Sequence, residues 1–226
     1  FYKNQAQFQS GLLAFYPFHD GGYGDQTSYY NYDNNVNKLS KNGNPGQVSG
    51  KLGDAFEFDN DPLPAVGSQE YAYTDDPSGI FGGNYGMTWN MWVNPTSAGN
   101  NVVLDKLDVF RFYINPTGTF YGYIYLETSG ENAGYGNCAI SSPFGLDEWQ
   151  MLTVTYDASD TSLRYYYDGV QFYTCDLSSG TGTAVPGEAL ASNTNPVCVA
   201  TQECGATASN LYTGDMDEVG LWSRAL

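Results

Sequence analysis

Short stretches in which apolar and polar residues alternate recur along the chain, and this period of two predicts β-strands. In residues 55–59, Phe56 and Phe58 face one side of the strand while Glu57 and Asp59 face the other. A helical period does not appear, and long runs of Ala, Leu, Glu and Lys are missing. The other longer strands that we expect span residues 11–18, 87–94, 102–106, 108–114, 119–127, 148–157, 163–168, 170–175 and 214–226.

Many short strands separated by turn residues predict an all-β fold built as a two-sheet antiparallel sandwich. The dipeptide Asp168-Gly169 is a strong hairpin signal between two of these strands. A sandwich of this size often forms one unit, so we expect a single domain over residues 11–226, with residues 1–10 as an arm or linker. Residues 177–210 are almost all small or polar, and we interpret them as a long excursion closed by a disulfide.

Charge narrows the range of partners. The chain carries 25 Asp and Glu residues against 8 Lys and Arg residues, for a formal net charge of -17. Such a surface repels phosphate groups, so we do not expect nucleic acid as a partner. No apolar run is long enough to span a bilayer, and we expect no membrane insertion.

The four cysteines are Cys138, Cys175, Cys198 and Cys204. They form no CxxC pair, and the single His19 cannot complete a zinc site with them. An even number of cysteines in an acidic chain favours disulfides and an extracellular location. Of the three possible pairings we favour Cys198–Cys204 as a short clasp with Cys138–Cys175 joining two hairpins, and four buried thiols are the alternative.

Four segments together resemble the LamG-like jelly-roll family of the concanavalin A-like lectin/glucanase superfamily. They are GLLAFYPFHD at residues 11–20, GKLGDAFEFDN at 50–60, the block from DEWQMLTVTYD to YYYDGVQ at 147–171, and YTGDMDEVGLWSRAL at 212–226. The resemblance implies a jelly-roll sandwich whose first and last strands are neighbours. Members of this family are mostly non-catalytic modules for sugar binding, adhesion or assembly.

The same resemblance implies a structural Ca²⁺ held by loop carboxylates and carbonyl oxygens, which are ligands that calcium prefers. For the last strand there is a second interpretation, in which Asp217 caps a turn and Glu218 pairs with Arg224. The candidate calcium ligands are Asp20, Asp25, Asn42, Asp59 and Asp217.

An aromatic sheet face is the candidate ligand site. If a five-residue loop pairs Ile114 with Phe120, one face carries a group of Tyr and Arg side chains of the kind that stacks on sugar rings. A four-residue loop would shift the register by one residue and separate them. The alternative role for these tyrosines is cross-strand packing under the long loops. The candidate ligand-binding residues are Arg111, Tyr113, Tyr121, Tyr123 and Tyr125.

The segment Glu57-Phe58-Asp59-Asn60-Asp61 is similar to the alternating-acid strand of glucanases in the same superfamily. Retaining glycosidases need two carboxyl groups about 5–5.5 Å apart. Asp61 is followed directly by Pro62, so we expect the strand to end before it, and we assign no catalytic residues.

The sequence therefore predicts an extracellular, non-catalytic, lectin-like module for carbohydrate binding or cell adhesion. Its partner would be a glycan or a cell-surface or matrix protein. The first alternative is a structural subunit of a surface filament, coat or appendage, in which copies of the chain pack through aromatic faces and the N-terminal arm. The second alternative is a glycoside hydrolase of the same superfamily.

Overall fold

The computed structural model describes most of the chain, and the statements below concern that part alone. The described residues are 10–18, 37–60, 65, 67–97, 99, 101–115, 119–128, 140–141, 145–179 and 184–226.

The larger sheet has eight strands, and all of its pairings are antiparallel. Strand β15 lies inside this sheet between β6 and β4 and also pairs with β1, so the first and last strands are neighbours as predicted. In spatial order the strands are β13 (Val170–Asp176), β12 (Ser162–Tyr167), β11 (Gln150–Asp157), β6 (Gly86–Pro95), β15 (Gly214–Trp222), β4 (Asp54–Phe58) and β3 (Gly46–Ser49), with β1 (Leu12–Tyr16) on β15.

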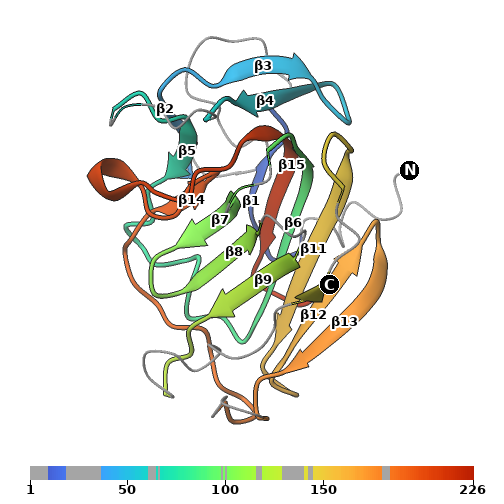
Figure 1. Cartoon of the computed structure of the whole chain (residues 1–226). Helices are drawn as coiled ribbons and strands as arrows, with labels where there is room; N and C mark the ends of the chain where they lie inside the picture. The colour runs from blue at the N-terminus through green and yellow to red at the C-terminus, as the bar shows by residue number, and fades with distance from the viewer. Residues whose placement is uncertain are drawn as a thin grey trace.

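The smaller sheet has seven strands, again all antiparallel, and Figure 1 shows its strands β7, β8 and β9 in front of β6, β11 and β15. Its order is β10 (Ile140–Ser141), β9 (Thr119–Ile124), β8 (Phe110–Ile114), β7 (Asn101–Lys106), β14 (Val197–Val199), β5 (Tyr71–Thr74) and β2 (Ser40–Asn42). The only helical element in the described ranges is the 3₁₀ turn η2 (Gly205–Thr207). The prediction of a two-sheet antiparallel jelly-roll sandwich is confirmed.

The core lies between the two sheets and is rich in aromatic rings. Trp89 of β6 contacts Phe110 and Phe112 of β8, with ring centroids 5.2 Å and 4.9 Å apart. Phe120 of β9 stacks on Phe112 at 6.1 Å and meets Tyr165 of β12 edge-to-face at 5.7 Å. Each such aromatic pair adds about 0.5–1.5 kcal/mol beyond the burial of its apolar surface. The inward positions of β8 and β9 are thus committed to the core, and their alternate residues face outward.

Strand β15 departs from the simple alternation that its sequence suggests. A bulge between Asp217 and Gly220 shifts the register, and Glu218 has a positive φ of 52°. Met216 therefore enters the core before the bulge, whereas Val219 and Leu221 enter it after the bulge. The prediction of a uniform period-two alternation along this strand was wrong. The extra residue of the bulge moves the side chains that follow it to the opposite face of the sheet.

Four strands of the smaller sheet, β2, β5, β10 and β14, lie where the sequence predicts no strand. Strand β5 falls between the strands expected over 55–59 and 87–94, and β14 falls inside the excursion expected over 177–210. All three residues of β14 are buried, and its sequence Val-Cys-Val shows no polar alternation. A strand that is covered on both faces carries no period-two signal, which explains why pattern alone missed it.

Candidate ligand-binding site on the smaller sheet

Strands β8 and β9 adopt the register in which Ile114 lies opposite Phe120 and Arg111 lies opposite Tyr123. This is the five-residue-loop alternative. Phe110, Phe112 and Ile114 are buried while Arg111 and Tyr113 are half-buried, so the arginine and tyrosine lie on the outer face. Tyr121 pairs with Tyr113 through the backbone, and its side chain lies outside the described part of the structure.

A pocket of about 210 Å³ opens on this outer face. Four of the five residues proposed from the sequence line this pocket, and the fifth, Tyr121, is not among its described lining residues. The pocket is lined by Arg111, Tyr113, Tyr123, Tyr125, Val102, Gln202 and Asn210.

Tyr113 and Tyr123 form the centre of the pocket wall. Their rings are stacked with centroids 5.5 Å apart and an angle of 12° between planes, and their hydroxyl oxygens are 2.7 Å apart. The two tyrosines are diagonal neighbours on adjacent strands, a separation that large aromatic rings can bridge. The stack holds both rings in one orientation, so little rotamer entropy remains to be lost on ligand binding.

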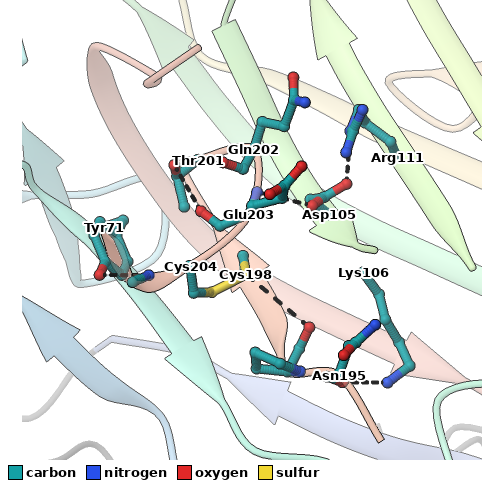
Figure 2. Close-up of a disulfide and its surroundings, with 12 residues drawn as sticks. Tyr71, Asp105, Lys106, Arg111, Asn195, Cys198, Thr201, Gln202, Glu203 and Cys204 are labelled. Atoms are coloured by element: carbon teal, nitrogen blue, oxygen red, sulfur yellow. Dashed lines mark hydrogen bonds and ion pairs between the residues drawn. A yellow bond between two sulfur atoms is a disulfide. The ribbon is translucent and has the colours of Figure 1, made fainter. Parts of the chain in front are cut away.

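Arg111 is fixed by Asp105, its cross-strand partner on β7. The guanidinium Nε donates to Asp105 Oδ1 at 2.7 Å, and the second carboxylate oxygen accepts the Glu203 amide N–H at 2.9 Å (Figure 2). Burial raises the pKa of Asp105, and the guanidinium of Arg111 opposes that rise. Burial acts to lower the pKa of Arg111, but Asp105 more than offsets it, so the arginine stays charged beside the pocket.

The second wall of the pocket is a short loop after β14 that carries Gln202 and Asn210. The side chains of these two residues share a hydrogen bond of 2.7 Å from Asn210 Nδ2 to Gln202 Oε1. The backbone of the loop is closed by reciprocal bonds between Gln202 and Ser209, at 2.9 Å and 3.1 Å. The amide side chains leave a donor nitrogen on Gln202 and an acceptor oxygen on Asn210 beyond the bond they share, which suits hydroxyl recognition.

A disulfide between Cys198 and Cys204 closes the base of this loop, six residues apart in sequence (Figure 2). Gly205, directly after the disulfide, donates its N–H to the Tyr71 hydroxyl of β5 at 2.9 Å. The predicted clasp is therefore present in the structure. Cys175 is also disulfide-bonded, and its expected partner Cys138 lies outside the described residues.

The wall residues Gln202 and Asn210 were not predicted as site residues. The predicted disulfide Cys198–Cys204 indicated a closed loop here, but no feature of the sequence indicated that this loop lies beside β7. That position follows from the pairing of β14 with β7, in which Cys198 lies opposite Asp105.

Among the described members of the predicted calcium set, Asn42 and Asp217 use their side chains in other hydrogen bonds, whereas Asp59 is held through its backbone amide. Asn42 donates to the Gln69 carbonyl at 2.7 Å, the Asp59 amide donates to Glu70 at 2.7 Å, and Asp217 accepts the Leu52 amide at 2.9 Å. Among the described residues, no three His, Cys, Asp or Glu side chains are grouped so that they could hold a metal ion. The calcium prediction stays untested, because Asp20 and Asp25 lie outside the described part.

The buried Asp217 does cap a turn, because Leu52 belongs to the connection between β3 and β4. Arg224 donates through Nε to the Ser10 carbonyl at 2.6 Å, which ties the last residues to the beginning of β1. The pairing of Glu218 with Arg224 stays a prediction. Glu57 is exposed on β4 opposite Asp215, and Asp61 lies outside the described residues.

The family model Laminin_G_3, described as concanavalin A-like lectin/glucanases superfamily, matches residues 66–226. The chain belongs to this superfamily. No protein of curated function matches the chain significantly in sequence.

Solved structures of similar fold come from proteins of several kinds. One is domain 4 of AbnA, a GH43 extracellular arabinanase from Geobacillus stearothermophilus, in complex with arabinotriose. It is 15% identical, with a TM-score of 0.62, and the match covers 96% of this chain and 94% of that one. A second is the binding domain of botulinum neurotoxin serotype D, which is 9% identical with a TM-score of 0.57. The match covers 99% of this chain and 50% of the toxin domain.

A third is the Trypanosoma rangeli sialidase in complex with sialic acid, 15% identical with a TM-score of 0.60. The match covers 96% of this chain and 31% of the sialidase. The chain thus spans half or less of the toxin and sialidase chains. At these identities the likeness concerns the fold. Within the described ranges, no helix has the length and apolar character needed to cross a bilayer.

Proposed function

We propose that this chain is a non-catalytic carbohydrate-binding module and that the pocket on the smaller sheet is its sugar site. The observation that carries the proposal is the convergence of Arg111, Tyr113, Tyr123 and Tyr125 on one pocket of about 210 Å³. Tyrosine rings provide flat apolar faces with polar tips, which match the alternating C–H and O–H surfaces of a sugar ring. Arginine and amide side chains supply the donors that fix its hydroxyl groups.

The rigidity of the pocket supports this role. Stacked tyrosines form one wall, a disulfide-closed loop forms the other, and the Arg111–Asp105 pair lies at the base. A site whose side chains are already ordered gains affinity because few of them must be immobilised on binding. Among the similar folds, the arabinanase domain was solved with arabinotriose and the sialidase with sialic acid. Those ligands belong to those proteins, and they support sugar binding here as an analogy of fold.

An extracellular or cell-surface location belongs to the same proposal. The disulfide Cys198–Cys204 supports it, because structural disulfides persist mainly in oxidising compartments. A glycan on a cell surface or in a matrix is then the proposed partner. A structural Ca²⁺ held by members of the set Asp20, Asp25, Asn42, Asp59 and Asp217 stays part of the proposal.

A glycan array probed with the chain, with and without EDTA, tests the proposal. We expect retention on a limited set of glycans, together with a lower signal in EDTA if calcium organises the long loop. Incubation of a bound polysaccharide with the chain should release no reducing sugar. Release of sugar would favour the glycoside hydrolase alternative. Failure to bind any glycan under either condition would refute sugar binding and favour assembly of copies of the chain.

A further inference from the structure

A second cavity of about 350 Å³ adjoins the first and shares Tyr125 with it. Its polar lining comes from Asp108, Glu127, Ser192 and Asn193. Tyr125 follows β9 directly and donates its amide N–H to the Val109 carbonyl at 2.9 Å, which continues the pairing of β8 with β9. The tyrosine therefore stands between two cavities at the end of one sheet face.

The two cavities follow the direction of β9. Tyr123 lines the first cavity, Tyr125 lines both, and Glu127 lines the second. Because an extended chain advances about 3.3 Å per residue, the Cα atoms of Tyr123 and Glu127 lie up to about 13 Å apart. One sugar ring cannot span that distance. The first cavity, at about 210 Å³, is smaller than the roughly 300–1,000 Å³ typical of small-molecule sites, whereas the two cavities together fall within that range.

Hydrogen bonds fix the turn that carries Asp108 beside the second cavity. Asp108 lies in the turn between β7 and β8, which is closed by a 2.9 Å bond from the Val109 amide to the Lys106 carbonyl. Asn193 donates to the Leu107 carbonyl of this turn at 2.8 Å. Lys106 forms a buried ion pair with Asp76, with Nζ 2.9 Å from Oδ2. The position of Asp108 is thus set before any ligand arrives.

The chemistry of the second cavity selects against anionic ligands. Asp108 and Glu127 place two carboxylates on its rim, and both residues are exposed. Carboxylates accept hydrogen bonds from sugar hydroxyls. They repel a uronic or sialic acid, and the net charge of -17 adds to that repulsion.

We propose that the two cavities form one groove for a neutral linear oligosaccharide, with successive sugar units on either side of Tyr125. This inference rests on the proposed function and narrows it to chains of two or more uncharged units, as opposed to a single terminal sugar. The unit in the first cavity stacks on the tyrosines. The hydroxyl groups of the unit in the second cavity donate hydrogen bonds to the carboxylates of Asp108 and Glu127.

Isothermal titration calorimetry with defined oligosaccharides tests the groove. The probes are arabino-, xylo- and gluco-oligosaccharides of one to six units, with oligogalacturonides as acidic counterparts. The variant is Asp108→Asn with Glu127→Gln. Asparagine tolerates the left-handed backbone at position 108, where φ is 57°, so the turn is retained. The matched control is Asp168→Asn, at φ 47° in the hairpin between β12 and β13 of the other sheet.

We expect affinity to rise at least tenfold from one to three units in a neutral series and then to level off. The double variant should lower affinity for the trisaccharide at least fivefold without changing that for the monosaccharide, and the control should change neither. Equal affinity for one and six units, with binding still lost in Tyr123→Ala, would refute the groove and leave the sugar site standing. Tighter binding of the acidic series would also refute it. No binding by any probe or glycan would overturn the proposed function itself.

Discussion

Arg111 Nε lies 2.7 Å from Asp105 Oδ1, so this cross-strand pair joins the pocket surface to the buried interior of the smaller sheet. Asp105 is fully buried and also accepts the Glu203 amide, which connects the sheet to the disulfide-closed loop. One carboxylate therefore orients both walls of the pocket.

Replacing Asp105 with Ala should lower the free energy of unfolding by about 2–4 kcal/mol, because it leaves a mostly buried guanidinium and a backbone amide without their acceptor. Denaturant unfolding at pH 7 measures this change. Arg164→Ala is the control: its partner Asp160 is largely exposed, and loss of such a surface pair costs about 1 kcal/mol or less. Equal losses in the two variants would mean that Asp105 has no special part in holding the pocket.

Opening the clasp should affect binding more than it affects folding. A disulfide between residues six positions apart contributes about 2 kcal/mol through the unfolded chain, so Cys198→Ser with Cys204→Ser should remain folded. The loop carrying Gln202 and Asn210 then loses its fixed position, and we expect at least a fivefold loss of affinity for an array-positive glycan. Calorimetry and thermal unfolding of the same samples separate the two effects. An unchanged affinity would exclude the loop from the site.

Tyr165→Phe should stabilise the protein. The Tyr165 hydroxyl is buried against Gly122, where an added Cβ would lie 2.3 Å from the oxygen, and it has no hydrogen-bond partner among the described residues. Removing a buried hydroxyl that lacks a partner should raise the free energy of unfolding by about 1 kcal/mol. The contrasting variant is Tyr16→Phe, which loses a buried 3.0 Å hydrogen bond to the Asn37 carbonyl. Its free energy of unfolding should fall by about 1 kcal/mol. A loss of stability in Tyr165→Phe would show that the hydroxyl is satisfied in solution.

Mild acid should stabilise the fold. Burial raises the pKa of Glu70, Asp105 and Asp215 above the ordinary values of 4.5 for Glu and 3.8 for Asp. The folded state thus binds these protons more tightly than the unfolded state, and their contribution is lost as pH rises through the folded pKa values. Protonation also reduces the self-repulsion of a chain with net charge -17.

We therefore expect a higher denaturation midpoint at pH 5 than at pH 7.5. Hydrogen bonds from Ser162 and Ser178 lower the pKa values of Asp160 and Asp176, respectively, so stability should fall again once pH drops below about 3.8. Thermal unfolding across this range tests both directions. A midpoint that declines steadily from pH 7.5 to pH 5 would contradict the assignment.

The outer face of β8 and β9 could be predicted because period-two alternation places Arg111, Tyr113, Tyr123 and Tyr125 on one side once the register is known. The register itself could not be chosen, since loops of four and five residues were both compatible with the Asn115-Pro116-Thr117-Gly118 turn. A buried Phe120 opposite Ile114 decides it in the structure.

The pattern of apolar and polar residues could predict neither the second wall of the pocket nor the bulge in β15. Gln202 and Asn210 reach the pocket only because the three-residue strand β14 pairs with β7, and a strand buried on both faces shows no alternation. Glu218 adopts a left-handed backbone in β15, a conformation that its residue type disfavours and that tertiary packing imposes. Local sequence preferences therefore predict the longer strands, whereas long-range pairing determines the short strand β14 and the second wall of the pocket.

The most direct test of the proposed sugar site is to measure how pocket substitutions change the affinity of the chain for a glycan that it binds on the array. Calorimetry should show at least a tenfold loss in Tyr123→Ala and in Arg111→Ala, with circular dichroism unchanged. Tyr166→Ala and Arg164→Ala, both on β12 of the other sheet, should bind as the unaltered chain does. Full affinity in the two pocket variants, or an equal loss in the β12 variants, would contradict the assignment of the sugar site to this face.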